Sequence, residues 1–139
     1  MDKQLLNYKK LSADEANQLN PQVLAFVGDG VYTMLLRAHF ALTSTAKSGK
    51  LHIYCSKLVR ATAQCVHLEL ITPLLTEQEA NIGRRARNTH IHSVAKNANI
   101  EEYKKATAFE AIFGYLYLTG QHERIYEFIN IILEKEASL

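Results

Sequence analysis

Two apolar segments of the chain each contain a single carboxylate close to a glycine, and this pairing limits how the chain can fold. Residues 22–37, QVLAFVGDGVYTMLLR, place Asp29 between two glycines, and residues 106–118, ATAFEAIFGYLYL, place Glu110 four residues before a glycine. Glycine inside a helix costs about 1 kcal/mol relative to alanine, and an ionised acid in apolar surroundings needs a cation or hydrogen bonds. We expect two helices that cross at their glycines and bury both acids in one shared pocket.

A pocket that holds two ionised carboxylates would also have to hold a positively charged group. Two neighbouring carboxylates repel, so both stay ionised only if a positive group lies between them. A hard divalent cation fits, because Mg²⁺ binds through one or two carboxylates together with waters and substrate phosphate. The alternative is structural: each acid is hydrogen-bonded to a neighbouring serine, tyrosine or helix end and binds nothing. The spacing of the residues leaves both interpretations open.

The rest of the chain has the periodicity and the capping residues of an all-α, single-domain protein. Asn20 followed by Pro21 is typical of a helix start. Thr76 and Glu79 have the spacing of a capping box, and Gly120 is a typical helix stop. No segment shows the alternation of apolar and polar residues that favours a strand. These signals predict helices that begin near Ser12 and that cover 21–42, 50–70, 77–87, 100–119 and 121–135.

The distribution of charge says more about partners than the net charge of +2 does. Residues 30–68 and 80–100 hold nine Lys and Arg and no Asp or Glu. Such an asymmetry indicates a polyanionic partner; the plain alternative is a solvated basic face. The chain opens without a charged and apolar leader, and its longest apolar run, 111–118, is too short for a membrane span. We expect a cytoplasmic protein without membrane contact, with Cys55 and Cys65 buried and reduced.

Both acidic segments resemble motifs of a known family. LAFVGDGVY, residues 24–32, resembles the ribonuclease III motif with the core LEFLGDAVL, and TAFEAIFGYLYL, residues 107–118, resembles its later element TVEALIGAIYLD. Residues 19–133 are most similar to the short form, Mini-ribonuclease III, which lacks the family's double-stranded RNA-binding domain. The resemblance implies an all-α helical bundle that forms a dimer, with an N-terminal lead-in over 1–18 and one catalytic domain over 19–136.

The resemblance also assigns roles to the acids. The matching residues are essential metal ligands in the family, which implies that Asp29 and Glu110 are catalytic and bind the metal. Full-length members have glutamates four and seven residues before the aspartate, where this chain has Ala25 and Gln22. They have an aspartate three residues before the later glutamate, where this chain has Thr107. Ala25 and Thr107 match the short form. These two replacements leave two metal-binding carboxylates in place of four, which implies weaker metal binding.

The implied function is hydrolysis of double-stranded RNA with Mg²⁺ or Mn²⁺, leaving 5′-phosphate and 3′-hydroxyl ends. The implied substrate is a ribosomal RNA precursor, that of 23S rRNA. One alternative is a ribosome-associated relative that binds RNA without cutting it; retention of Asp29 and Glu110 argues against it, while Ala25 and Thr107 keep it open. Another is a helical dimerisation module, which leaves the acids and the acid-free basic stretches unexplained.

RNA contacts are expected at phosphates and 2′-hydroxyls, because the A-form major groove is too narrow for side chains to read bases. A duplex has two strands and each chain has one site, so the resemblance implies a homodimer with its two sites across the duplex. Phe26 lies where the family has an apolar dimer contact; alternatively, Phe26 belongs to the core of its own chain. His90 and His92 have no Cys or third ligand near them, so phosphate contacts, or no role at all, fit them better than catalysis or zinc binding. The expected RNA-binding residues are Arg84, Arg85, Arg87, Asn88, His90, Lys96, Lys57 and Arg60.

Overall fold

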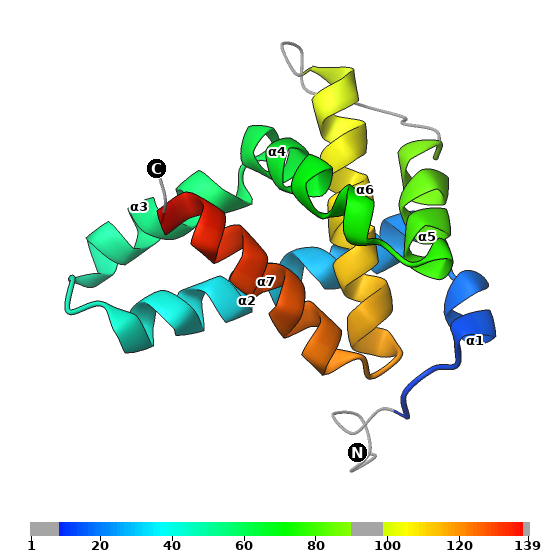
Figure 1. The fold of residues 1–139 in the computed structure, drawn as a ribbon, viewed down its shortest axis with the longest axis horizontal. Helices are drawn as coiled ribbons and strands as arrows, with labels where there is room; N and C mark the ends of the chain where they lie inside the picture. The colour runs from blue at the N-terminus through cyan, green and yellow to red at the C-terminus, as the bar shows by residue number, and fades with distance from the viewer. Residues whose placement is uncertain (1–8, 90–98, 138–139) are drawn as a thin grey trace, which may run out of the picture.

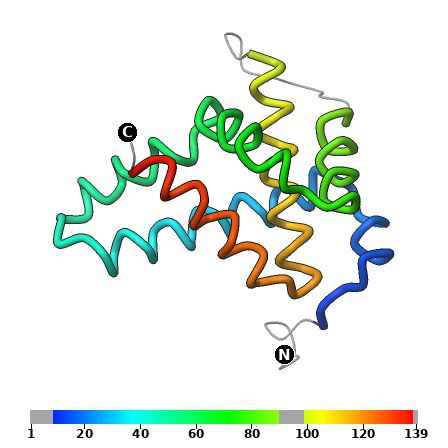
Figure 2. Tube along the Cα trace, in the orientation of Figure 1, coloured from blue at the N-terminus to red at the C-terminus, as the bar shows by residue number. Residues whose placement is uncertain are grey.

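The computed structural model describes residues 9–89 and 99–137, and every regular element within these ranges is helical (Figures 1 and 2). The all-α fold class expected from the sequence is confirmed. Within the described ranges, no helix has both the length and the apolar character needed to cross a bilayer. The elements are α1 Ala13–Asn17, α2 Pro21–Thr43, α3 Ser48–Val59, α4 Ala61–Ile71, the 3-10 turn η1 Thr72–Leu74, α5 Glu77–Arg87, α6 Ile100–Leu118 and α7 His122–Ala137.

Helix α6 is the centre of the molecule, and α2, α4, α5 and α7 pack around it (Figure 1). From Ala106 to Leu118 its residues are apolar apart from Thr107 and Glu110, as expected for a helical segment surrounded by protein. The ring of Phe109 lies 5.0 Å from that of Tyr32 on α2, edge to face. The ring of Phe113 lies 6.3 Å from that of Phe128 on α7. These aromatic contacts join α2 and α7 to one continuous core.

Helices α2 and α6 cross at Gly28 and Gly114, as the sequence predicts. A Cβ atom at Gly28 would overlap the carbonyl oxygen of Glu110 and lie 2.6 Å from its carbonyl carbon. A Cβ atom at Gly114 would overlap the carbonyl oxygen of Leu24 and lie 2.7 Å from its carbonyl carbon. Only glycine fits either position without moving the helices apart. Gly30 has nothing within 4 Å of its Cβ position and takes no part in the crossing.

The helix ends expected from capping residues are confirmed. The Asn20 side chain accepts a hydrogen bond from the Gln22 N–H at 2.9 Å, at the start of α2. At the start of α5, the Thr76 N–H donates to the Glu79 carboxylate at 2.8 Å, and the Glu79 N–H donates to the Thr76 hydroxyl at 3.2 Å. Gly120, with a φ of 75°, follows the end of α6. Local side-chain chemistry therefore sets these boundaries.

The prediction of a single helix over residues 50–70 is wrong. The structure has two helices there, α3 and α4, separated by Arg60, whose backbone is extended with φ −67° and ψ 153°. Helix α3 packs against α2, whereas α4 packs against α6. The break lets each half follow a different partner, and it occurs without a glycine or proline at the junction. Tertiary packing therefore overrides the helical propensity of this segment.

Helix α7 is attached through a buried ion pair. Arg124 donates to both carboxylate oxygens of Glu79 at 2.9 Å and to the Leu74 carbonyl at 2.6 Å. Its guanidinium carbon lies 4.2 Å from the centroid of the Phe128 ring. Burial raises the pKa of the Glu79 carboxyl, but hydrogen bonds from Arg124 and from Thr76 outweigh burial, and the net pKa is lowered. The pair is therefore charged in the folded protein, and removing one partner would leave the other uncompensated.

Candidate active site

The crossing of α2 and α6 brings Asp29 and Glu110 together. Gly28 touches the backbone of Glu110, and Asp29 is the next residue on α2. Both acids line one open pocket of about 460 Å³, as the sequence predicts. Helices α2 and α6 supply two of its walls, and the junction of α3 and α4 supplies the third. The lining residues are Gln22, Ala25, Phe26, Asp29, Val59, Ala61, Gln64, Tyr103, Ala106, Thr107 and Glu110.

The expectation that both acids are buried is wrong for Asp29. Its side chain is exposed, whereas Glu110 is half-buried. Gly28 is the residue that faces α6 at the closest approach, and each step along a helix turns the side chain by about 100°. Asp29 is thereby directed to the edge of the crossing, where it meets solvent. The pocket therefore has one acid at its mouth and one deeper in its wall.

Glu110 holds a proton more tightly than an ordinary glutamate. Burial is the largest cause, followed by a hydrogen bond with Asp29 and by the negative charge of Asp29, and together they raise the pKa of the Glu110 carboxyl to about 8. The two side chains are therefore close enough to share a proton. At neutral pH, without a cation, Glu110 keeps that proton; a divalent cation between the two acids would replace it and relieve the repulsion.

The donor groups of the pocket fit a hard divalent cation. Carboxylate, amide and hydroxyl groups line it, and its described lining residues include neither histidine nor cysteine. Mg²⁺ and Mn²⁺ prefer such oxygen ligands, whereas zinc prefers nitrogen and sulfur. Among residues 9–89 and 99–137, no group of three or more His, Cys, Asp or Glu is placed to hold a metal. Two carboxylates are sufficient for Mg²⁺, which keeps several of its waters and takes further ligands from a substrate phosphate.

Comparison with known proteins identifies the family. Residues 22–121 match the Ribonuclease III domain. A Mini-ribonuclease 3 of Brevibacillus brevis is 44% identical over 83% of this chain and 86% of its own length. A Mini-ribonuclease 3 of Staphylococcus aureus is 36% identical over 96% of each chain. A crystal structure of a protein from Fusobacterium nucleatum matches with a TM-score of 0.77 at 32% identity, over 86% of this chain and 95% of that one.

The chain belongs to the ribonuclease III family, in its Mini-ribonuclease III form. Family membership identifies it as a ribonuclease. The three positions at which it lacks the acids of full-length ribonuclease III, Gln22, Ala25 and Thr107, all line the same pocket as Asp29 and Glu110. These three differences from full-length members therefore fall in the candidate site itself.

The structure separates the expected RNA-binding residues of this Mini-ribonuclease III into two groups. Arg84, Arg87 and Asn88 line a second pocket, of about 470 Å³, together with residues of α6 that include Ala108. Ala108 and Glu110 point about 200° apart around α6, at roughly 100° per residue. The arginines of α5 therefore lie across α6 from the acids of their own chain. His90 and Lys96 lie outside the described residues.

Four of the expected basic residues form a hydrogen bond or an ion pair within the chain, and Lys57 is exposed. Arg84 donates to the Asn81 side chain, Arg87 lies 3.5 Å from a Glu101 carboxylate oxygen, and Arg85 donates to Asn17 at 3.4 Å. Lys57 is exposed on α3. Arg60 donates through Nε to the Ser56 carbonyl at 3.2 Å, and its neighbours Val59 and Ala61 line the acidic pocket. Of the expected residues that the structure describes, Arg60 is thus the one whose two chain neighbours line the pocket of the acids.

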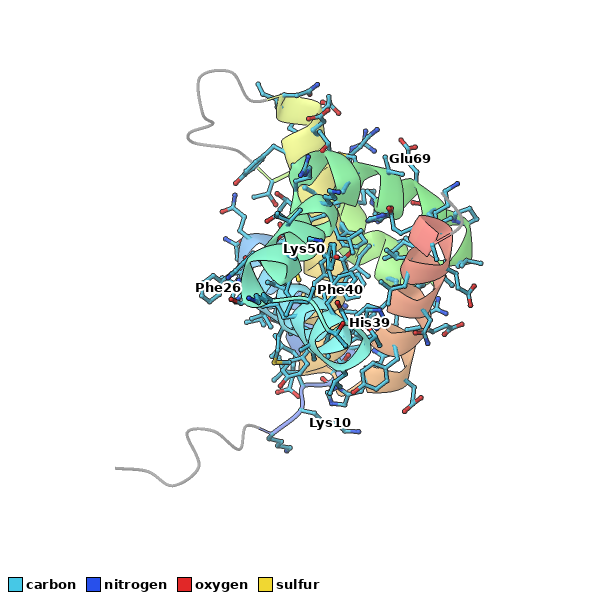
Figure 3. All side chains as sticks on the ribbon, turned by 90° about the vertical axis from the view of Figure 1, so that its left-hand side faces the viewer. Lys10, Phe26, His39, Phe40, Lys50 and Glu69 are labelled. Carbon is cyan, nitrogen blue, oxygen red and sulfur yellow. The ribbon has the colours of Figure 1, made fainter. Side chains whose placement is uncertain are left out.

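Phe26 does not belong to the core of its own chain. Its side chain is 80% exposed, and it lies at the margin of the molecule, directed away from the helices (Figure 3). It also lines the acidic pocket. That it contacts a partner chain stays a prediction, while the alternative of an intrachain core position is wrong.

Gln64, Tyr103 and Val59 are lining residues that the sequence did not single out. Gln64 carries the one recognisable signal: it is a polar residue between Ala63 and Cys65, on a stretch of helix expected to be apolar on that side. Tyr103 and Val59 carry none, because their place depends on the break at Arg60 and on the crossing of α4 and α6, which local patterns do not reveal.

Proposed function

We propose that the chain is an endoribonuclease that cleaves double-stranded RNA with a divalent cation, Mg²⁺ or Mn²⁺, held by Asp29 and Glu110. The observation that carries this proposal is the sharing of one open, oxygen-lined pocket by the two acids at the glycine crossing of α2 and α6. The substrate that we propose is a ribosomal RNA precursor, that of 23S rRNA, on the basis of the family resemblance.

The reaction consists of the addition of water to the scissile phosphorus and loss of the 3′-oxygen, which leaves 5′-phosphate and 3′-hydroxyl ends. A bound divalent cation supplies an activated water and neutralises charge on the phosphate. Asp29 and Glu110 hold the cation and, once Glu110 has released its proton, supply the negative charge that binds it. The helix backbones that carry the two acids are in contact at Gly28 and Gly114, so the segments that bear the acids are held together before RNA binds.

A homodimer would place two such sites across one duplex, and we propose that Phe26 lies in its interface. Val23, Phe26 and Met34 are exposed apolar residues of α2, and they lie on one side of that helix at spacings of three and eight residues. Large apolar side chains gathered on one exposed face are typical of an interaction surface. We further propose that Lys57 and Arg60 bind phosphates near the cleaved bond, and that Arg84, Arg85, Arg87, Asn88, His90 and Lys96 bind the duplex farther along.

The proposal is tested by incubating the full chain with a structured ribosomal precursor RNA, with and without Mg²⁺, and by mapping both ends of each product. We expect cuts within paired regions that require the metal and leave 5′-phosphate. Cuts in single strands, or cyclic 2′,3′-phosphate ends, would contradict the reaction proposed. Binding of duplex RNA without any cleavage under all metal conditions would instead support a non-catalytic relative.

Asp29→Asn is the matched variant for this assay. It keeps the shape of an exposed side chain and removes the charge that holds the cation, so we expect Mg²⁺-dependent cleavage to fall by about 100- to 1,000-fold, the order of loss seen when one preorganised electrostatic group is removed from an active site. Duplex binding should change little, since the acid does not attract RNA. Asp14→Asn, also exposed but on α1, is the control. Full cleavage by Asp29→Asn would remove this residue from the site.

A further inference from the structure

Gln64 on α4 carries a buried side-chain amide nitrogen that has no hydrogen-bond partner among the described residues. Its side chain is 2% exposed, and its Nε2 atom makes no hydrogen bond within the described residues. Buried polar groups in folded proteins almost always have partners, since an unpaired one incurs its full desolvation penalty. The backbone of Gln64 is satisfied, with its N–H donating to the Arg60 carbonyl at 3.0 Å. An apolar side chain of similar volume would fill the same place without the penalty, so packing alone does not account for the amide.

The position of Gln64 beside the acidic pocket distinguishes its side-chain nitrogen from the other buried atoms that lack a partner. Among the described residues, the hydroxyl of Tyr32 and Nδ1 of His67 are also buried without a partner. Neither residue lines the acidic pocket, whereas Gln64 forms part of its wall together with Asp29 and Glu110. Burial, a missing partner and a place beside the acids therefore coincide at Gln64.

The chemistry of the pocket indicates what the amide would bind. An RNA strand brings oxygen atoms that accept hydrogen bonds, and the ionised carboxylates of Asp29 and Glu110 can only accept as well. The amide of Gln64 offers two N–H donors and no charge. A lysine in its place would also donate, but its positive charge would pair with the acids and compete with the cation. A neutral, buried donor can hold a strand beside two metal-binding acids without interfering with them.

We propose that Gln64 is a substrate-positioning residue whose side-chain amide donates a hydrogen bond to an oxygen of the RNA strand at the cleaved bond. This inference rests on the proposed function. The oxygen belongs either to the scissile phosphate or to a neighbouring 2′-hydroxyl, both of which accept from an amide. The hydrogen bond fixes the strand relative to Asp29 and Glu110, and it supplies the partner that the amide lacks in the free chain.

Gln64→Leu removes the amide and keeps much of the volume. We expect the thermal midpoint of the free protein to stay the same or to rise, because an unpaired buried polar group is replaced by an apolar one. Single-turnover cleavage at saturating RNA and Mg²⁺ should fall about 10- to 100-fold, the loss that corresponds to one hydrogen bond to a charged group. Gln18→Leu, at an exposed glutamine, is the control and should match the unaltered chain.

Two binding measurements separate this role from others. The affinity of Gln64→Leu for uncut duplex RNA, measured without divalent metal, should be weaker than that of the unaltered chain, while its affinity for Mn²⁺ without RNA should be the same. A loss of Mn²⁺ affinity would show that the amide supports the cation and would overturn the RNA contact. A change in self-association of Gln64→Leu would show that the amide serves the partner chain, and would also overturn it.

Single 2′-deoxy substitutions on either side of the cleaved bond identify the acceptor. If Gln64 binds a 2′-hydroxyl, the substitution and Gln64→Leu together should slow cleavage no more than either does alone. If it binds the phosphate, the two losses should multiply. Unchanged cleavage and RNA binding by Gln64→Leu would overturn this inference and leave the proposed function intact. An unaltered chain that neither binds nor cuts duplex RNA would overturn both.

Discussion

Glu110 lowers the stability of the folded chain at neutral and higher pH, and the same side chain is proposed to bind the divalent cation. Its pKa of about 8 in the folded chain lies far above the ordinary glutamate value near 4.5, which the unfolded chain retains. As pH rises between these values, the unfolded chain loses the proton and the folded chain keeps it, so the folded state loses stability relative to the unfolded one. The cost is relieved when a divalent cation binds, since a cation favours the ionised form.

Glu110→Gln should therefore raise the thermal midpoint of the metal-free protein at pH 8, by about 4 °C for each kcal/mol of destabilisation removed. At pH 4, where the glutamate is largely protonated in both states, the variant and the unaltered chain should melt alike. Mg²⁺ should stabilise the unaltered chain and have little effect on Glu110→Gln. Thermal melts at both pH values measure this, with Glu134→Gln, at an exposed position, as the control. A lower midpoint for Glu110→Gln at pH 8 would contradict the role given to burial.

At the level of elements, the contact between α2 and α6 depends on Gly28 and Gly114 and not on Gly30. Gly28→Ala places a methyl group on the backbone of Glu110, 2.6 Å from its carbonyl carbon, so the helices must separate. We expect a loss of about 3 kcal/mol in the free energy of unfolding, within the range for overpacked cores. Gly30→Ala meets nothing within 4 Å and should stabilise α2 by up to about 1 kcal/mol.

Urea denaturation of these two variants measures both effects against the unaltered chain. The pair controls for helix propensity, because both substitutions replace glycine by alanine in the same helix. Equal changes in stability for Gly28→Ala and Gly30→Ala would show that the close approach at Gly28 does not matter for stability.

The same level shows which parts of the fold could be predicted from the sequence. Helix ends marked by Asn20, Thr76 and Gly120 follow from hydrogen bonds within a few residues, and the structure has them. The crossing at Gly28 and Gly114 could be inferred because glycine in an apolar helix has few other uses. The break at Arg60 could not, since it depends on which helices α3 and α4 pack against. The places of Val59 and Tyr103 in the pocket wall could not be predicted for the same reason. The exposure of Asp29 depends on which face of α2 meets α6, and that face is set by the crossing at Gly28.

At the level of the whole molecule, the arginines of α5 and the acids occupy opposite sides of α6. The double variant Arg84→Glu, Arg87→Glu should weaken duplex binding and reduce the slope of log affinity against log salt, by about one unit for each phosphate that is no longer bound. Lys9→Glu, Lys10→Glu is the charge-matched control, since these exposed residues adjoin the other end of α6. Figure 3 shows Lys10 on that end of the molecule. An unaltered salt slope in the arginine variant would place the RNA surface elsewhere.

Assembly is tested by the exposed ring of Phe26. Phe26→Ser should convert a dimer into a monomer and leave the fold of each chain nearly as stable, because the ring is 80% exposed and contributes little to its own core. Leu42→Ser, at a residue of the same helix that is 86% exposed, is the matched control and should stay dimeric. Analytical ultracentrifugation of the unaltered chain, Phe26→Ser and Leu42→Ser measures the oligomeric state of each. A monomeric unaltered chain, or a Phe26→Ser variant that still pairs, would contradict the interface.

The contact of bare backbone between α2 and α6 also limits how the molecule can be redesigned. Substitutions at exposed positions of α3 and α5 leave the approach of the α2 and α6 backbones untouched, because that approach is set by main-chain atoms at Gly28 and Gly114. Exposed residues of α3 and α5 can therefore be substituted to change which RNA duplexes bind, while the crossing of α2 and α6 stays the same.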